Sequence, residues 1–221
     1  MPTDSTISGE VNSKEPDLES VSIAFTSTQW MNAPTNVVSN IPSLGFCLSY
    51  FHDYKLNGNN ITLAPGLSFA NQVSATNAGF IYHWNAVSHE FDTTTLFPDT
   101  SSYTSNRLSQ QWIEIPLELR FRTNNNEKGK SFKIAIGAKA GYMIGNHYTH
   151  AEKDEDGLIS KFKMYHIRNL NPLEYGLTGR IGFGSASLAA YYSLSDFFKS
   201  DKGSEVQPLV ISLSFSLNTN P

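Results

Sequence analysis

The chain has 221 residues, a formal net charge of −4 and a pI near 5.8, so it lacks the basic footprint that nucleic-acid binding requires. Charged residues make up 16% of the chain, below the roughly 25% of soluble domains, and aromatic residues make up 12%. The sequence contains no run of about 18 apolar residues, which excludes a transmembrane helix, and the single cysteine, Cys47, excludes an internal disulfide framework.

Residues 1–20 are predicted to form a flexible polar tail, because they present no periodic apolar face. This tail has neither the basic region nor the apolar segment of a signal peptide, so an exported protein is expected to have lost its signal already. A barrel domain is expected over residues 21–217, followed by a short tail over 218–221. Cys47 lies in an alternating segment and is predicted to be a small interior residue rather than a nucleophile.

Period-two alternation of apolar and polar residues predicts eight β-strands. They cover residues 21–26, 44–50, 61–69, 111–122, 132–142, 173–183, 188–194 and 209–217. Pro65, inside the third strand, is expected to mark a bulge or a missing hydrogen bond. The segment 81–84 (Ile-Tyr-His-Trp) is expected to extend the preceding hairpin beyond the barrel wall.

The connections between these strands alternate in length. The predicted turns, 55–60, 124–130 and 184–187, are short, whereas the predicted loops, 29–42, 71–107, 147–171 and 196–206, are longer. Outer-membrane barrels have this asymmetry, with short periplasmic turns, long extracellular loops and an even number of strands. A soluble lipocalin-like barrel also has eight strands.

The strand 111–122 shows what distinguishes the two barrels. Its odd positions from Ile113 to Phe121 are apolar, and its even positions include Glu114, Glu118 and Arg120. A soluble barrel would turn the apolar face inward, whereas a membrane barrel would turn it to lipid and enclose the charges. Across all strands the non-apolar face carries mostly Gly, Ser, Thr and Ala with a few charges of both signs. Small residues leave room for a few ionic ones in a narrow lumen, so the sequence favours the membrane barrel.

Charges on this face predict a structural ionic network in the lumen, because an unpaired buried charge is costly. The predicted members are Glu114, Glu118, Arg120, Lys139, Glu174 and Arg180. Pairing of neighbouring strands is expected to bring Glu114 near Lys139. An eight-stranded barrel is just wide enough for its side chains, so the network is expected to fill the lumen, with a gating or transport role as the alternative.

Aromatic residues near the predicted strand ends are expected to form girdles at the two membrane interfaces. These residues are Trp30, Tyr50, Trp84, Trp112, Tyr142, Tyr148, Tyr165, Tyr175 and Tyr192.

No catalytic, cofactor or metal site is predicted. The sequence has no Gly-x-Ser-x-Gly elbow and no phosphate-binding loop. His147 and His150 could supply two metal ligands, but strong metal motifs have more fixed spacing, so the loop 147–171 is expected to be solvated.

The segment 113–121, with its Glu-Ile-Pro-Leu motif, resembles the PorT-type outer-membrane β-barrel family of Bacteroidetes-type bacteria. Three further segments match strand motifs of that family, namely 136–142, 175–184 and 191–198. The resemblance covers residues 107–217 well and 21–71 only by pattern. It implies a location in the cell outer membrane and no catalytic residues. A few relatives take part in protein secretion.

Pattern and resemblance together predict an all-β fold, an eight-stranded antiparallel up-and-down transmembrane β-barrel. The expected function is that of a small non-enzymatic structural or interaction barrel with a plugged lumen and exposed loops, alone or as a subunit of an envelope secretion or uptake complex. Its expected partners are outer-membrane lipid and other envelope proteins, with no nucleic acid and no cofactor. The alternatives are a soluble lipocalin-like barrel that binds a small apolar ligand and a barrel-form membrane enzyme.

Overall fold

The structure is a computed structural model that describes residues 18–40, 43–57, 60–99, 103–123, 131–154 and 156–218. Its elements are the strands β1 (Leu18–Met31), β2 (Ser39–Asn40), β3 (Leu44–Asn57), β4 (Ile61–Thr76), β5 (Ala78–Asn85), β6 (Glu90–Pro98), β7 (Tyr103–Arg122), β8 (Phe132–Lys153), β9 (Ile159–Tyr165), β10 (Leu173–Phe183), β11 (Ala186–Ser193) and β12 (Gln207–Asn218). The described ranges contain no helix with the length and apolarity needed to cross a membrane.

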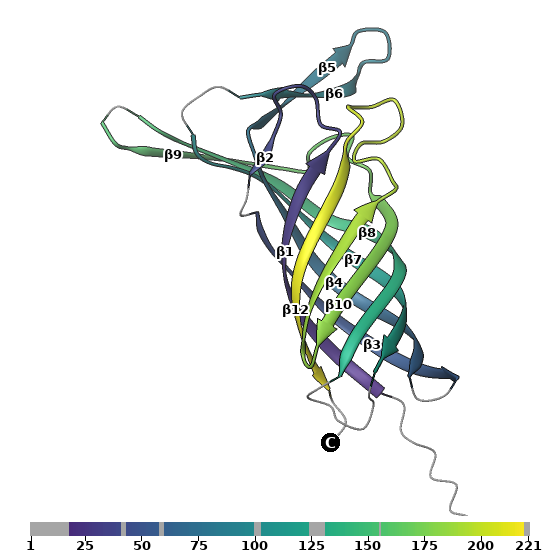
Figure 1. Ribbon diagram of the computed structural model, residues 1–221. Coiled ribbons are helices and arrows are strands. Elements are labelled where there is room, and N and C mark those ends of the chain that lie inside the picture. The colour runs from purple at the N-terminus through teal and green to yellow at the C-terminus, as the bar shows by residue number, and fades with distance from the viewer. Residues whose placement is uncertain are drawn as a thin grey trace, which may run out of the picture.

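Eight of these strands close into a ring in which neighbours run antiparallel (Figure 1). The order around the ring is β1-β3-β4-β7-β8-β10-β11-β12, and β12 pairs back onto β1 along its length. Ser20 pairs with Asn218, so the N-terminal end of β1 and the C-terminal end of β12 lie at the same end of the barrel. The predicted eight-stranded up-and-down barrel is confirmed, and each predicted strand overlaps one strand of the ring.

Several barrel strands are longer than predicted. β1 begins at Leu18, inside the predicted tail of residues 1–20, and β12 ends at Asn218. Residues 1–17, 124–130 and 219–221, which hold the rest of both predicted tails and one predicted turn, lie outside the described residues. β4, β7 and β8 also continue into the predicted loops 71–107 and 147–171.

Above the ring the chain forms hairpins where the sequence predicted loops. β5 pairs with β6, while β9 pairs with β8 from His147 to Lys153. In Figure 1 these hairpins lie at the end of the barrel opposite the C-terminus. The prediction that residues 81–84 extend the preceding hairpin is wrong, because β4 ends at Thr76 and these residues belong to β5, which forms a separate two-stranded sheet with β6.

Pro65 interrupts the ladder without a bulge. The partners on β3 and β4 pass from Phe51 and Gly66 to Tyr54 and Leu63 with no change of register, and the pairs between them are missing. A proline has no N–H to donate, which accounts for a local loss of pairing. This is the second of the two outcomes expected from the sequence.

The charged face of the barrel points inward and the apolar face outward. On β7, Glu114 and Glu118 are 3% and 2% exposed, whereas Ile115 and Leu117 are 65% and 47% exposed. Large apolar side chains are likewise exposed along the other strands of the ring. An apolar outer wall around an ionic interior is the arrangement of a membrane barrel and the reverse of a lipocalin-like one.

The hydrophobic core lies at the loop end of the barrel and under the hairpins. The Trp30 ring lies 5.1 Å from the Phe197 ring, which lies 5.0 Å from that of Phe198. The buried members of this apolar layer are Trp30, Val37, Ala70, Ala78, Leu96, Leu108, Trp112, Met143, Tyr148, Ile167, Leu170, Phe197, Phe198 and Val206.

The prediction of interfacial girdles is therefore wrong for Trp30, Trp112 and Tyr148, which are buried in the apolar layer. Trp112 shares the inward phase of Glu114, two residues further along β7, and strand alternation fixes its direction. The other predicted girdle residues, Tyr50, Trp84, Tyr142, Tyr165, Tyr175 and Tyr192, are exposed.

Candidate functional site

Arg120 on β7 is at the centre of a cluster of ion pairs at the turn end of the lumen. Its Nε donates to Glu118 Oε2 at 2.8 Å, and its Nη1 donates to Asp53 Oδ1 at 2.9 Å. From β10, Arg180 Nη2 donates to the other oxygen of Glu118 at 2.9 Å, and Arg122 pairs with the other oxygen of Asp53. Each carboxylate thus bridges two guanidinium groups. We name Asp53, Glu118, Arg120, Arg122 and Arg180 the arginine cluster.

A second cluster lies nearer the loop end, where Lys139 of β8 is shared between two carboxylates. Its Nζ donates to Glu114 Oε1 at 2.5 Å and lies 3.3 Å from Glu174 Oε1. Gln72 Nε2 donates to Glu174 Oε1 at 3.0 Å, and the ammonium lies 3.9 Å from the centroid of the Tyr191 ring. We name Gln72, Glu114, Lys139, Glu174 and Tyr191 the lysine cluster.

Gly141 lies in close contact with the two carboxylates of the lysine cluster. A Cβ at this position would lie 3.0 Å from Cγ of Glu174 and 3.3 Å from Cγ of Glu114. A side chain at this position would therefore require Glu174 and Glu114 to shift by a few tenths of an ångström. This agrees with the abundance of small residues on the inward face.

The six residues predicted for the ionic network all lie in these two clusters, and Glu114 meets Lys139 as expected. They do not form one network, because a cavity of about 80 Å³, which Cys47 also lines, separates the clusters. Sequence reasoning missed Asp53, Arg122, Gln72 and Tyr191 as members. Asp53 was detectable, since it continues the inward phase of Cys47 and Phe51 beyond the predicted end of that strand.

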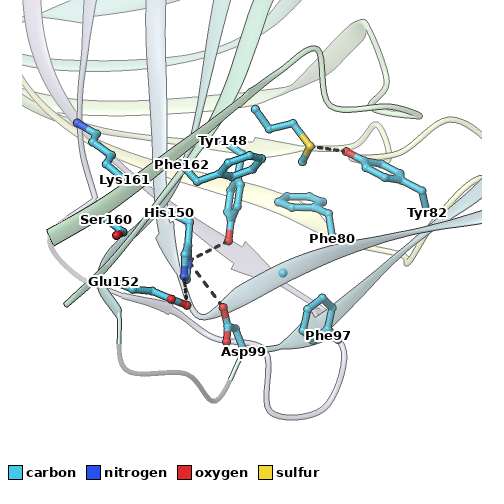
Figure 2. A pocket seen from close by; sticks show the side chains of 12 residues that line it. Phe80, Tyr82, Phe97, Asp99, Tyr148, His150, Glu152, Ser160, Lys161 and Phe162 are labelled. Atoms are coloured by element: carbon cyan, nitrogen blue, oxygen red, sulfur yellow. Dashed lines mark hydrogen bonds and ion pairs between the residues drawn. The ribbon is translucent and has the colours of Figure 1, made fainter. Parts of the chain in front are cut away.

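A cleft of about 520 Å³ opens outside the barrel, between the β5–β6 hairpin and the β8–β9 hairpin (Figure 2). One wall is a face of the β8–β9 ribbon, on which three cross-strand pairs stand side by side. These pairs are Tyr148 with Met164, His150 with Phe162, and Glu152 with Ser160. Gly79, Phe80, Tyr82, Phe97, Asp99 and Lys161 complete the lining.

Polar and aromatic groups occupy different sides of this cleft. Figure 2 shows Phe80 and Tyr82 on one side and His150 with Glu152 on the other. His150 Nε2 lies 2.9 Å from Glu152 Oε1, and its Nδ1 lies 3.7 Å from Asp99 Oδ2. The Phe80 ring stands edge-on to that of Tyr148 at 5.2 Å.

The hydroxyl of Tyr148 is a neutral donor in this cleft. Burial, and after it the nearby Asp99 carboxylate, raises the pKa of Tyr148 to about 12, because both disfavour the phenolate. Burial also raises the pKa of Tyr82, whose hydroxyl contacts Met164 Sδ. Both phenols therefore stay protonated at any physiological pH.

The two histidines considered as a metal pair point apart. His147 and His150 are three residues apart on β8, so alternation places them on opposite faces of the ribbon. His147 lies against Tyr165, outside the cleft lining, and the predicted solvated loop is here a pair of strands. Among the described residues no three His, Cys, Asp or Glu side chains are placed to hold a metal ion.

Comparison with known proteins identifies a family and several distantly similar structures, among them two outer-membrane barrels. The family described as "Outer membrane protein beta-barrel domain" matches residues 20–199. Ail, the attachment invasion locus protein of Yersinia pestis, solved in complex with the heparin analogue sucrose octasulfate, is 13% identical over 91% of this chain and 99% of its own, with a TM-score of 0.37. The N-terminal β-barrel domain of Pseudomonas aeruginosa OprF is 10% identical over 91% of this chain and 100% of its own, with a TM-score of 0.29. No curated protein matches the chain.

Proposed function

The chain belongs to the outer membrane protein beta-barrel domain family, and on this premise we propose that it is a non-enzymatic barrel with a plugged lumen that presents its hairpins outside the cell. Family membership places it in the outer membrane. The plug, the absence of catalysis and the interaction role are the parts that we propose.

One observation supports a plugged lumen: successive layers of side chains fill the lumen from the loop end to the turn end. The apolar layer around Trp112 comes first, followed by the lysine cluster and then the arginine cluster. The cavity of about 80 Å³ between the clusters holds a few waters at most. The lumen carboxylates are nearly completely buried and engaged by cations, which supports a structural rather than a catalytic role.

Planar lipid bilayers test this proposal. We expect the purified barrel to insert without stepwise conductance, because an eight-stranded barrel filled with side chains leaves no water path. Glu118→Gln is expected to stay closed as well, since the apolar layer and the lysine cluster remain intact. Stable conductance steps in the wild-type protein would contradict the plug, and steps that appear only in Glu118→Gln would indicate a gate in place of a structural network.

A role in contacts with other envelope proteins is the second part of the proposal. The outer edge of β9 pairs with no other strand in the described part of the chain, and Ile159, Phe162 and Tyr165 on it are exposed. Open strand edges are sites where another chain can add a strand. The motifs shared with PorT-type barrels on β7, β8 and β10 support placing the protein near that group.

The partner contact is testable by photo-crosslinking. A photoreactive residue in place of Lys163 on β9 is expected to give a discrete crosslinked band in native outer membranes, whereas the same residue at Ile136 on the lipid-facing wall is expected to give none. The absence of a band from position 163 would contradict a partner at the β9 edge.

A further inference from the structure

The cleft between the two hairpins has the dimensions of a small-molecule site. Ligand sites are concave, enclose roughly 300–1,000 Å³ and combine apolar or aromatic walls with a few convergent polar groups. This cleft encloses about 520 Å³ and has both kinds of wall. It lies beyond the closed ring and shares Tyr148 with the apolar layer at the loop end of the lumen.

The polar side of the cleft offers donors and acceptors in a mixed set. Asp99 and Glu152 bring carboxylates, and His150 and Ser160 can each donate and accept, whereas the Lys161 side chain points to the opposite face of β9. A purely apolar ligand would bury these groups without hydrogen bonds, which is costly. An anionic ligand would meet two carboxylates, and a cationic one would compete with His150, which both carboxylates already contact. The set suits an uncharged ligand that bears several hydroxyl groups.

The aromatic side supplies a surface on which such a ligand can lie. Phe162 is 59% exposed, and its ring stands beside His150 on the same face of the ribbon. Phe80, anchored edge-on to Tyr148, faces the cleft from the other hairpin. A sugar ring has an apolar C–H face that packs on an aromatic ring and a rim of hydroxyl groups that each donate and accept.

We propose that the cleft between β5–β6 and β8–β9 binds an uncharged saccharide, which stacks on Phe162 and hydrogen-bonds to His150, Asp99 and Glu152. The site is assembled from two hairpins that are far apart in the sequence. Its occupancy therefore also depends on how firmly the β5–β6 hairpin is held against the barrel.

The test is titration of the full chain with neutral trisaccharides, in a detergent without a sugar head group such as lauryldimethylamine oxide. Cellotriose, maltotriose and tri-N-acetylchitotriose are the probes, with a sulfated heparin disaccharide and trialanine as the comparison ligands. We expect at least one neutral trisaccharide to bind, and to give saturation-transfer NMR signals from its ring protons. The sulfated disaccharide and the peptide are expected to bind more weakly.

Phe162→Ala and Tyr165→Ala form a matched pair of variants. Both residues are exposed aromatics on β9, at 59% and 61%, but Tyr165 lies against His147 on the opposite face. We expect Phe162→Ala to weaken trisaccharide binding about tenfold, similar to the loss of an aromatic ring that stacks on a nucleobase. We expect Tyr165→Ala to leave trisaccharide binding unchanged. Heat-modifiable gel migration confirms that both variants are folded.

Three results would overturn the proposal. They are the failure of every neutral trisaccharide to bind at millimolar concentration, equal or tighter binding of the sulfated disaccharide or the peptide, and equal weakening by both variants. None of these results bears on conductance, so the plugged lumen would still stand if the saccharide site failed.

Discussion

At the scale of single residues, the barrel interior depends on matched charges. Lys139 has about a tenth of its side chain exposed, and the two carboxylates beside it are more deeply buried. The attraction within such a group offsets the cost of removing its members from water, but a carboxylate left without its cation keeps the whole desolvation cost. The lysine cluster is therefore more sensitive to the loss of its one cation than to the loss of either carboxylate.

We predict that Lys139→Met lowers the free energy of unfolding by about 3–5 kcal/mol, the usual effect of removing one partner from a buried ion pair. The measurement is urea unfolding in lipid vesicles, followed by tryptophan fluorescence. Lys163→Met, on the exposed β9 strand, is the matched control and should change stability by less than about 0.5 kcal/mol. Equal stability of the two variants would show that Glu114 and Glu174 need no cation.

At the scale of elements, both strands of the β5–β6 hairpin contact the rest of the molecule: Phe80 and Tyr82 of β5 contact the β8–β9 ribbon, and β6 contacts the segment around Lys202. Thr94 N–H donates to the carbonyl of Lys202 at 2.8 Å, and the side chain of Lys202 pairs with Asp92. The hydrogen bond from Lys202, and after it the one from Asn85, lowers the pKa of Asp92. The Asp92 carboxylate is thus more stable in the attached hairpin than in a detached one.

Because the pKa of Asp92 is lowered in the folded protein, the contribution of this ion pair is present above the ordinary carboxyl pKa and is lost as pH falls through the lower, folded value. We predict that Asp92→Asn speeds amide exchange at Thr94 at neutral pH, and that the difference from wild type disappears in acid, where the wild-type carboxyl is also neutral. Asp156→Asn, at the tip of the other hairpin, is the control. Identical exchange of wild type and Asp92→Asn at neutral pH would contradict this anchor.

The sequence predicted the elements well where they meet lipid and poorly above the membrane. In the wall one face of each strand is apolar, so alternation is strict, as from Ile113 to Phe121. Above the ring the alternation is short: on β9 only Phe162 and Met164 alternate with Lys161 and Lys163, and nearly every residue of this strand is exposed. The cleft is built from these ribbons and could not be found from the pattern.

Inside the barrel, alternation predicted direction but not neighbours. The inward phase identified Glu114, Glu118 and Lys139, yet the division into two clusters depends on the register around the ring, which brings Arg180 of β10 to Glu118 and Asp53 of β3 to Arg120. Trp112 also has this inward phase, and the phase predicts its direction correctly, whereas its place near a predicted strand end suggests an interfacial girdle.

At the scale of the whole molecule, the barrel has polar and apolar side chains in the reverse of the arrangement found in soluble globular proteins. Its outer wall is apolar, its interior is ionic, and its apolar core closes the loop end beneath the hairpins. An outer wall of this kind is stable only in lipid, where each apolar side chain avoids water and closure of the ring satisfies the backbone hydrogen bonds. The plugged lumen leaves the hairpins as the part that can meet other molecules.

The most direct test of this arrangement is nitroxide accessibility at successive positions 113–119 of β7, with Cys47 replaced by serine, in lipid bilayers. The structure predicts high oxygen accessibility at Ile113, Ile115, Leu117 and Leu119, since these side chains face the hydrocarbon. At the alternate positions it predicts low accessibility both to oxygen and to a water-soluble nickel reagent, because the lumen is packed. High nickel accessibility at the alternate positions would reveal a water-filled pore, and nickel accessibility at the odd positions would contradict the lipid-facing wall itself.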